Sequence, residues 1–336
     1  MSGPPSPVTL EDVARVSGYS RATVSRVVNK HASVDKQIAQ KVDEAIEALG
    51  YVTNPSARAL AGGATMTIGL VFTEPFRELF RNPYWGAVVE GISAVLWEAE
   101  YQMVFLIRDQ LQRRRIETYL MQHHVDGVVL VSAPRGDDLE STLVKRGLPV
   151  VLCGTPFDPS AMSSATIDEL QVGRVAAERL VARGCRSPVV ISGRDDMRES
   201  HIRPQSFVDS VGDSGIAVSP ERIVSGDFTE AGGRRAMSEL LDRVPDLDGV
   251  FACSDRMAIG ALNELHERGR RVPDDVALIG VDGTLLGDSA RPRLTSVGCD
   301  MHGLGRELAA LILGAIQGDS VKRVIFPPHL VVRETA

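Results

Sequence analysis

From Thr67 onward, short apolar runs alternate with helix-like segments, and this alternation limits the fold more than any other feature of the chain. The runs are rich in β-branched residues and apolar throughout, as are strands of a parallel sheet covered by helices on both faces. They are IGLVF (68–72), MVFLI (103–107), GVVLV (127–131), PVVLC (149–153), PVVIS (188–192), GVFAC (249–253) and VALIG (276–280). The helical stretches are Trp85–Ala99, Leu170–Arg183, Gly233–Val244 and Met257–Arg268. The pattern predicts a doubly wound α/β architecture.

Two groups of runs, on either side of about residue 165, favour two similar lobes over one very large sheet. Polar residues follow the runs: Thr73-Glu74, Ser132, Gly154-Thr155, Ser192-Gly193, Ser254-Asp255 and Val281-Asp282-Gly283. Ligands of open α/β sheets bind at these carboxyl ends, so a cleft between the lobes is expected to hold a small molecule. The alternative for each residue is a cap or a turn, and for Asp255, directly before a helix, we favour the cap.

Residues 8–53 have a different pattern, that of a small all-helical module. Thr9 precedes Leu10-Glu11-Asp12, a hydroxyl cap followed by acids, which marks a helix start. A turn with Gly18 separates this helix from a second one, Arg21 to Asn29, with valines on its inner face. Its outer face carries Arg21, Ala22, Ser25 and Arg26. Two short helices around a glycine turn, the second basic, are typical of the helix-turn-helix that enters the DNA major groove.

A third helix is expected over about Asp35 to Leu49, and the segment NPSARALAGG (54–63) follows it. Asparagine at the cap, proline at the first helical position and glycine beyond the end predict a complete miniature helix in this segment. A helix this short is not stable by itself in water. We therefore expect it to form against a partner, such as a second copy of itself on DNA.

The segments TLEDVA, SRATVSRVVN and NPSARALAG occur together here, and the chain resembles the lactose-repressor (LacI/GalR) family of bacterial transcription regulators along almost its whole length. The resemblance implies two periplasmic-binding-protein-like lobes joined by three crossovers. It also implies a homodimer on a palindromic operator of double-stranded DNA. No leucine heptad follows His329–Glu334, which favours a dimer over a tetramer. The expected parts are a disordered tail (1–7), a helix-turn-helix head (8–53), a hinge helix (54–63), a first lobe (66–164 plus 294–322) and a second lobe (165–293 plus 323–336).

The resemblance assigns the reading of bases to Arg21 and Ala22. An arginine suits bidentate contact with guanine, which contributes ~1–3 kcal/mol of discrimination, and Arg26 is expected to contact a base or a phosphate. Leu60 is implied as the wedge that opens the central base step in the minor groove. The other candidate DNA contacts are Thr9, Ser20, Thr23, Ser25, Asn29, Asn54, Ala57 and Arg58.

For the effector, Arg203 in HIRPQSF (201–207) matches the family's Arg-x-x-Gly-Phe, and Asp282 in GVDG (280–283) matches its Gly-Tyr/Phe-Asp-Asp. An arginine fork and a carboxylate facing one cleft suit the hydroxyls of a polyol. The alternative for both residues is a salt bridge between the lobes. Phe228 is expected to stack on the effector, with a core position as the alternative. The further effector candidates are Tyr84, Trp85, Asp168 and Ser254, with a core position as the alternative for the tyrosine and tryptophan and a hinge position for Asp168.

The chain also departs from the family at four positions, so its effector cannot be copied from a well-known relative. Gly283 replaces the family's second Asp or Asn, and Ser206 replaces the glycine after the arginine. Cys299 stands where several sugar-binding members have glutamine, and Gly154 stands where many have aspartate or arginine. The stretches 79–85 and 226–282 look most like regulators of cellulose-derived oligosaccharide use. A cello-oligosaccharide or another plant-derived sugar is therefore expected to release a repressor from its operator. The alternatives are a non-sugar effector, a ligand that acts as co-repressor, and a sugar-binding protein without an operator.

Net charge first argues against DNA binding, because the 336 residues carry a formal charge of −7. Residues 1–63, however, hold seven Lys/Arg and six Asp/Glu, a net charge of +1, so the acidity belongs to the remainder. DNA attraction depends on the local patch. The four cysteines, at 153, 185, 253 and 299, have no paired spacing, which argues against zinc and a disulfide framework. We expect buried thiols and neither metal nor cofactor.

The first residues, MSGPPSPV, lack the basic start and apolar stretch of a signal peptide. No apolar run approaches the ~20 residues of a membrane helix. The sequence also lacks the phosphate-loop, HExxH and GxSxG motifs of nucleotide-binding proteins, metalloproteases and hydrolases. The expectation is a cytoplasmic regulator without a membrane partner, and not an enzyme.

Overall fold

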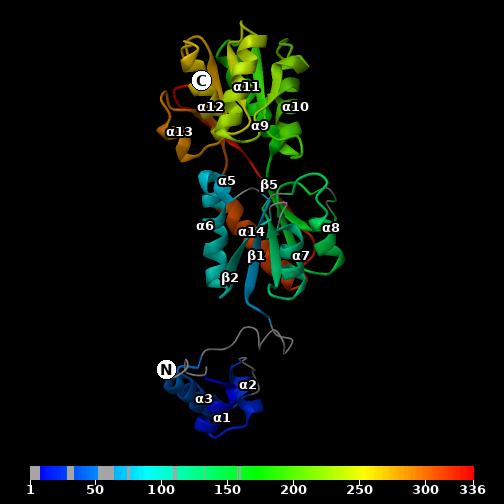
Figure 1. The fold of residues 1–336 in the computed structure, drawn as a ribbon, viewed down its shortest axis with the longest axis vertical. Coiled ribbons are helices and arrows are strands. Elements are labelled where there is room, and N and C mark those ends of the chain that lie inside the picture. Colours follow the sequence, from blue (N-terminus) through cyan, green and yellow to red (C-terminus); the bar gives the residue numbers. More distant parts are fainter. Residues whose placement is uncertain are drawn as a thin grey trace. The chain divides into compact units, whose positions relative to one another are not determined.

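The computed structural model describes residues 8–28, 34–51, 64–73, 76–108, 112–131, 133–156, 158 and 160–336. The chain forms two compact units, Met1–Thr65 and Met66–Ala336 (Figure 1). The predicted tail (1–7) and hinge helix (54–63) lie outside the described residues. The same holds for the predicted DNA contacts Asn29, Asn54, Ala57, Arg58 and Leu60.

The first unit contains the three predicted helices, α1 (Leu10–Ser17), α2 (Arg21–Val28) and α3 (Lys36–Leu49). Thr9 and Asp12 cap α1 reciprocally: the Asp12 N–H donates to Thr9 Oγ1 at 3.3 Å, and the Thr9 N–H donates to Asp12 Oδ2 at 3.0 Å. The helices share a core in which Val13, Val24 and Val42 are fully buried. Apolar side chains at helical spacing therefore build this small unit.

The first lobe of the second unit has a parallel six-stranded sheet in the order β11-β5-β4-β3-β1-β2. Its strands are β1 (Thr67–Phe72), β2 (Gln102–Ile107), β3 (Gly127–Leu130), β4 (Val150–Cys153), β5 (Ser163–Ile167) and β11 (Arg323–Phe326). Its helices are α5 (Phe76–Arg81), α6 (Pro83–Glu98), α7 (Arg113–Met121), α8 (Leu139–Lys145) and α14 (Met301–Ile316).

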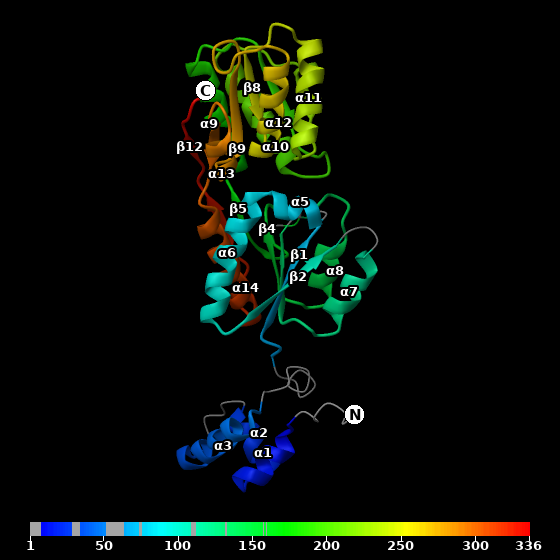
Figure 2. The ribbon, with the colours of Figure 1, turned by 60° about the vertical axis from the view of Figure 1, so that its left-hand side comes forward.

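Alternate residues of the strands face opposite helix layers, as the apolar runs predict. Leu70 and Phe72 share a core with α6 and α14, while Val71 between them packs with α7 and α8. Figure 2 shows α6 and α14 on one side of the sheet and α7 and α8 on the other. Both faces of the central strands are buried, which is why β1, β3 and β4 read as continuous apolar runs.

The second lobe repeats this arrangement, with the strand order β12-β10-β9-β8-β6-β7 (Figure 2). Its strands are β6 (Pro188–Ser192), β7 (Ile223–Ser225), β8 (Gly249–Ala252), β9 (Ala277–Asp282), β10 (Thr295–Gly298) and the antiparallel β12 (His329–Val331). Its helices are α9 (Glu169–Ala182), α10 (Glu199–Gly212), α11 (Glu230–Arg243), α12 (Asp255–Glu267) and α13 (Leu285–Ser289). The predicted doubly wound α/β architecture in two lobes is confirmed.

Of the three crossovers, which the resemblance places near residues 164–167, 291–294 and 322–326, the first and the third lie at the ends of these segments, and only the second lies a few residues later. β5 and β11 pair with each other in the first sheet, whereas β10 pairs with β9 in the second. The chain therefore changes lobe after residues 167, 298 and 326. The predicted segments 165–167 and 323–326 belong to the first lobe, and 294–298 to the second. β5 and β10 contain serine, threonine and glycine in place of an apolar run, so their sequences did not mark them as strands.

Among the helices of the described residues, none has the length and apolar character needed to cross a membrane.

Candidate functional site

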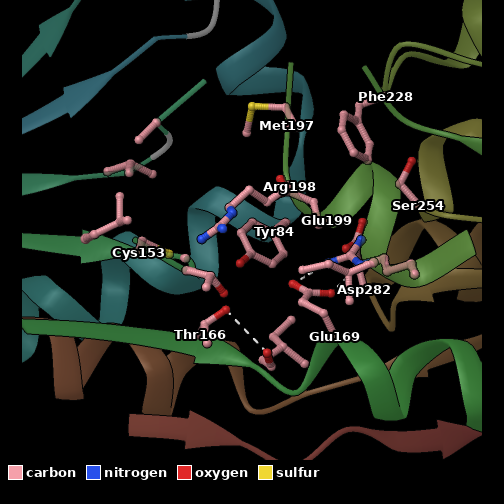
Figure 3. A pocket seen from close by; sticks show the side chains of 18 of the residues that line it. Tyr84, Cys153, Thr166, Glu169, Met197, Arg198, Glu199, Phe228, Ser254 and Asp282 are labelled. Carbon is pink, nitrogen blue, oxygen red and sulfur yellow. Dashed lines mark hydrogen bonds and ion pairs between the residues drawn. The ribbon is translucent and has the colours of Figure 1, made fainter. Parts of the chain in front are cut away.

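A cavity lies between the two lobes, at the carboxyl ends of β3, β4 and β5 in the first sheet and of β9 in the second. The described residues that line it from the first lobe are Asn82, Tyr84, Trp85, Val131, Ala133, Leu152, Cys153, Gly154, Thr155, Thr166 and Ile167. Those of the second lobe are Glu169, Met197, Arg198, Glu199, Ile202, Arg203, Phe228, Ser254 and Asp282. In Figure 3, Cys153 and Thr166 lie on one side of the cavity, opposite Phe228, Ser254 and Asp282.

The start of α6 places two aromatic rings in the first-lobe wall. Asn82 accepts a hydrogen bond from the Tyr84 N–H at 3.2 Å, and Pro83 occupies the first helical position, so the helix begins here. The rings of Tyr84 and Trp85 meet edge to face, with centroids 4.5 Å apart. Burial raises the pKa of Tyr84 well above its ordinary value, and a hydrogen bond joins its hydroxyl to the Cys153 thiol. The aromatic edge is therefore neutral and fixed.

Arg203 and Glu169 form a buried ion pair in the opposite wall. Arg203 Nε and Nη2 donate to the two carboxylate oxygens of Glu169 at 2.5 and 3.1 Å. Arg203 Nη1 donates to the Cys253 carbonyl at 2.8 Å, and the two charged side chains are only 7% and 12% exposed. Burial alone lowers the pKa of Arg203, but Glu169 and Asp282 outweigh it and hold that pKa above its ordinary value. The guanidinium is permanently charged and oriented before any ligand arrives.

Close packing of α9 on α10 brings this pair together. A Cβ on Gly173 of α9 would lie 2.5 Å from the Arg203 carbonyl oxygen of α10, so only glycine allows the helices to approach this closely. Ser206, at the position where the family pattern has glycine, donates its hydroxyl hydrogen to the Leu170 carbonyl at 2.5 Å. The serine therefore ties the same two helices together.

Asp282 ends β9 and is 8% exposed, with a backbone φ of +114° that non-glycine residues rarely adopt. Burial raises its pKa well above the ordinary value, and the charge of Asp255 raises it further. Asp255 lies behind the wall and accepts hydrogen bonds from Ser296 Oγ at 2.5 Å and from the N–H and hydroxyl of Thr284 at 2.8 and 2.9 Å. Burial raises the pKa of Asp255 to about 6 despite these bonds.

Phe228 extends the second-lobe wall from the loop after β7. Its backbone φ is +62°, a left-handed conformation that costs a non-glycine residue about 1–2 kcal/mol. A Cβ on Gly193 would lie 1.9 Å from the Phe228 ring, so a glycine is required beneath it. Ser254 caps α12 by accepting a hydrogen bond from the Met257 N–H at 3.2 Å.

Six of the seven predicted effector residues line this cavity: Tyr84, Trp85, Arg203, Phe228, Ser254 and Asp282. Asp168 differs from the prediction, because its carboxylate accepts a hydrogen bond from the Gln171 N–H at 3.0 Å and caps α9. Its neighbour Glu169 enters the cavity wall instead. Glu169, Arg198 and Glu199 also line the cavity but were not predicted, because they stand in charged stretches typical of surface helix starts.

The alternative of an interlobe salt bridge does not describe Arg203, because its partner Glu169 belongs to the same lobe. Other contacts between described residues do join the lobes. Arg256 Nη2 of α12 pairs with Glu78 Oε2 of α5 at 2.5 Å. Arg198 Nη1 donates to the Pro156 carbonyl at 2.6 Å, and the Arg135 N–H donates to the Asp196 carbonyl at 2.7 Å. The described part of the chain holds no cluster of His, Cys, Asp and Glu suited to a metal ion.

In the first unit, α2 has the predicted orientation. Val24 and Val27 are buried, while Arg21, Ala22 and Arg26 are exposed. Arg21 Nε lies 2.8 Å from Glu11 Oε1 in an ion pair whose side chains are 70% and 62% exposed. Such a pair contributes about 0–1 kcal/mol and is easily exchanged for a phosphate or base.

Three of the predicted DNA contacts also serve the helix starts of this unit. Thr9 belongs to the capping box of α1. Ser20 Oγ accepts a hydrogen bond from the Thr23 N–H at 3.2 Å and lies 2.9 Å from Thr23 Oγ1. Ser25 is half-buried on α2.

Comparison with known proteins agrees with both units. Residues 9–54 match the family described as bacterial regulatory proteins, lacI family, and residues 177–336 match a periplasmic binding protein-like domain. The HTH-type transcriptional regulator CelR of Thermobifida fusca is 39% identical over 97% of this chain and 98% of its own length. The chain belongs to the LacI family. Catabolite control protein A of Priestia megaterium, another relative, is 30% identical over 96% of this chain and 97% of its own.

Solved structures show the same fold. A complex of the regulator CelR with cellobiose matches with a TM-score of 0.79 and 38% identity, covering 98% of this chain and all of that one. The lac repressor dimer bound to operator and the anti-inducer ONPF matches with a TM-score of 0.84 at 24% identity, over 98% of this chain and 99% of that one. This LacI-family protein is a DNA-binding transcriptional regulator of the helix-turn-helix type, and the relatives named here are transcriptional regulators.

Proposed function

We propose that this regulator binds a short cello-oligosaccharide, of which cellobiose is the simplest, in the cavity between its lobes, and that the sugar releases it from operator DNA. The observation that carries the proposal is the pairing of an aromatic wall with a charged wall. Tyr84 and Trp85 of the first lobe and Arg203 and Asp282 of the second lobe line the same cavity. The full-length likeness to the CelR–cellobiose complex supports the choice of sugar.

The chemistry of the walls suits a β-linked glucose chain. Its equatorial hydroxyls form a polar rim that can accept from a guanidinium and donate to a carboxylate, while its ring faces are apolar and stack on aromatic rings. Arg203 and Asp282 supply the first kind of contact, and Trp85 and Phe228 supply the second. Ser254 and Tyr84 complete the proposed set with hydroxyl groups.

On DNA, we propose a homodimer that places two copies of α2 in successive major grooves of a palindromic operator. Arg21 and Ala22 would read bases, and Arg26 would contact a base or a phosphate. The exposure of Arg21, Ala22 and Arg26 on α2 supports this assignment. Ser20, Thr23 and Ser25, with Thr9 of α1, would fix the register through phosphates. Such a regulator acts on chromosomal DNA in the cytoplasm and has no catalytic role.

For the proposed release from DNA, we propose that the two lobes adopt two alternative arrangements. Sugar contacts both walls, so it favours one separation of the lobes over another, and the interlobe pair Arg256–Glu78 would differ between the two states. Coupling of this kind is reciprocal: cellobiose must weaken operator binding by the same factor by which operator weakens cellobiose binding.

Calorimetric titration of the full chain with cellobiose, cellotriose, maltose and lactose tests the effector proposal. We expect saturable binding of the two cellulose-derived sugars and at least tenfold weaker binding of maltose. Cellotriose and cellobiose should also lower the affinity for an operator selected from random duplex DNA. If cellobiose binds but strengthens operator binding, the sugar is a co-repressor; if none of the four binds, the proposed effector is wrong.

The DNA proposal is tested with Arg21→Ala, using Arg15→Ala as the control. Both variants remove one positive charge from the first unit, but Arg15 lies on α1 and pairs with Asp12. We expect Arg21→Ala to relax the preference at one base pair per half-site by ~1–3 kcal/mol. An equal loss of affinity for every sequence would assign Arg21 to a phosphate.

A further inference from the structure

The second-lobe wall of the cavity carries five charged residues, namely Glu169, Arg198, Glu199, Arg203 and Asp282. Three are acids and two are arginines, so positive charge is not in surplus around the ligand, even when burial keeps Asp282 protonated. The first-lobe wall adds no charged side chain among the described residues. A ligand with a negative charge would therefore enter an environment without a surplus of positive charge.

Arg203, the residue best suited to attract an anion, is already engaged. Glu169 accepts from Nε and Nη2, and the Cys253 carbonyl accepts from Nη1. A guanidinium has five N–H donors, so two remain for a ligand. Two donors are enough for two sugar hydroxyls, but the positive charge they carry is balanced by a carboxylate in direct contact.

The pair cannot easily open to admit a ligand anion in place of Glu169. Both side chains are at least 88% buried, and the carboxylate would lose its partner in a site that water hardly reaches. Leaving one member of a buried pair unpaired is strongly unfavourable. Glu169 also begins α9, whose close packing on α10 through Gly173 holds it against Arg203.

We propose that Glu169 is a specificity residue that restricts the cavity to uncharged sugars and excludes the corresponding sugar acids and sugar phosphates. It does so by neutralising Arg203 and by repelling a second carboxylate or phosphate from the two remaining N–H groups. Because it holds Arg203 in place, Glu169 also positions the donors that bind hydroxyls. This inference rests on the proposed sugar-binding function.

The test compares three ligands of equal size: cellobiose, the disaccharide in which C6 of one glucose ring is oxidised to a carboxylate, and the C6 amide of that acid. Acids and amides oxidised on either ring are used. Calorimetry on the wild-type chain should give affinities for cellobiose and the amides within about fivefold of each other. The acids should bind at least thirtyfold more weakly. Equal affinity for acid and amide on both rings would overturn the proposal.

Glu169→Gln removes the charge and keeps the shape. We expect the ratio of amide affinity to acid affinity to fall at least tenfold in this variant, chiefly because acid binding improves. Glu199→Gln is the matched control, since it removes a carboxylate from the same wall while the Arg203–Glu169 pair remains. If Glu199→Gln changes the ratio as much as Glu169→Gln does, total charge and not the pairing sets the selectivity, and the role of Glu169 is refuted.

Glu169→Asp retains the charge and should retain the rejection of acids, with weaker binding of cellobiose. Thermal unfolding and operator binding without ligand report whether each variant is folded; if Glu169→Gln is not, Glu169→Asn is used for the same comparison. A wild-type chain that binds no neutral cello-oligosaccharide would refute the proposed function itself. One that binds cellobiose and both acids equally would refute only the inference about Glu169.

Discussion

The two walls of the cavity are built from similar lobes but from different chemistry. Eleven described residues of the first lobe line it without a single charge, whereas five of nine in the second lobe are charged. The first wall is fixed by aromatic packing around Tyr84 and Trp85. The second is fixed by ion pairs and by carboxylates held in strained or buried positions. In the proposed binding mode, the charged second-lobe wall therefore orients the sugar, and aromatic side chains of both lobes stack on it.

The largest effect is expected from Arg203→Ala, which leaves Glu169 buried without its partner. Breaking a buried ion pair from one side typically costs about 3–5 kcal/mol. Urea denaturation should show a loss of this order in the free energy of unfolding, and cellobiose binding should disappear in calorimetry. The control is Arg194→Ala, whose pair with Asp196 is 34% and 40% exposed and contributes about 0–1 kcal/mol. If Arg203→Ala unfolds with the same free energy as the wild-type chain, the Arg203–Glu169 pair does not stabilise the fold.

Asp255→Asn tests the carboxylate behind the same wall through its pH dependence. The pKa of Asp255 is raised from 3.8 to about 6. Between these values the unfolded chain releases the proton and the folded chain keeps it, so this group lowers the free energy of unfolding as pH rises, by up to about 3 kcal/mol. Urea denaturation at pH 4 and pH 7 should show that the variant lacks this decrease.

Asp275→Asn is the matched control for that experiment, because the hydrogen bonds from Arg271 lower the pKa of Asp275 to about 2. Its contribution to stability is present above pH 4 and is lost only as pH falls towards 2. A wild-type profile that Asp255→Asn leaves unchanged between pH 4 and pH 7 would contradict the prediction.

Gly193→Ala tests whether cellobiose binding depends on the position of the Phe228 ring. The new Cβ would overlap the ring, and overpacking of this kind costs about 1–3 kcal/mol. If the overlap destabilises the sugar complex more than the free protein, cellobiose binding should weaken roughly tenfold. Gly212→Ala, at an open position of α10, should change neither ligand binding nor the fold. Unchanged affinity in Gly193→Ala would remove Phe228 from the proposed site.

The smallest effect is expected in the uncharged wall, from Tyr84→Phe. The ring stays and only the hydrogen bond to Cys153 is lost, a contribution of about 0.5–1.5 kcal/mol. Binding of cellobiose should weaken by only a few fold in calorimetry. Tyr101→Phe, at the end of the turn before β2, should have no effect on binding. A loss as large as that of Arg203→Ala would reverse the contrast between the two walls.

The sequence predicted the fold wherever a strand is buried on both faces. The runs around β1, β3, β4, β6, β8 and β9 are continuous and apolar, so burial alone identifies them. β5 and β10 are equally buried but contain serine, threonine and glycine, whose polar groups bond to other parts of the chain. Ser163 Oγ, for example, accepts from the Lys322 N–H at 3.0 Å. Contacts across 159 residues leave no local pattern, so β5 and β10 were not predicted as strands.

The candidate site was predictable where a residue stands in a distinctive segment, as Arg203 and Asp282 do. Glu169 was missed because the residue before it, Asp168, has the sequence character of both a cap and a ligand. Only the three-dimensional packing of α9 against α10 shows which of the two carboxylates reaches the arginine. The sequence therefore shows which residue types occur near the site, but it does not show which side chains point into the cavity.

The first lobe is completed by segments that follow the second lobe along the chain, and this order has a consequence for folding during translation. The first sheet is completed by β11 and covered by α14, which lie more than 130 residues beyond β5 along the chain. A ribosome that has translated residues 66–168 has therefore made five strands of a sheet whose outer edge is unpaired and whose covering helix does not yet exist. Exposed edges and uncovered apolar faces promote aggregation. The regulator is thus a protein whose first lobe must be protected until residues 301–326 have left the exit tunnel.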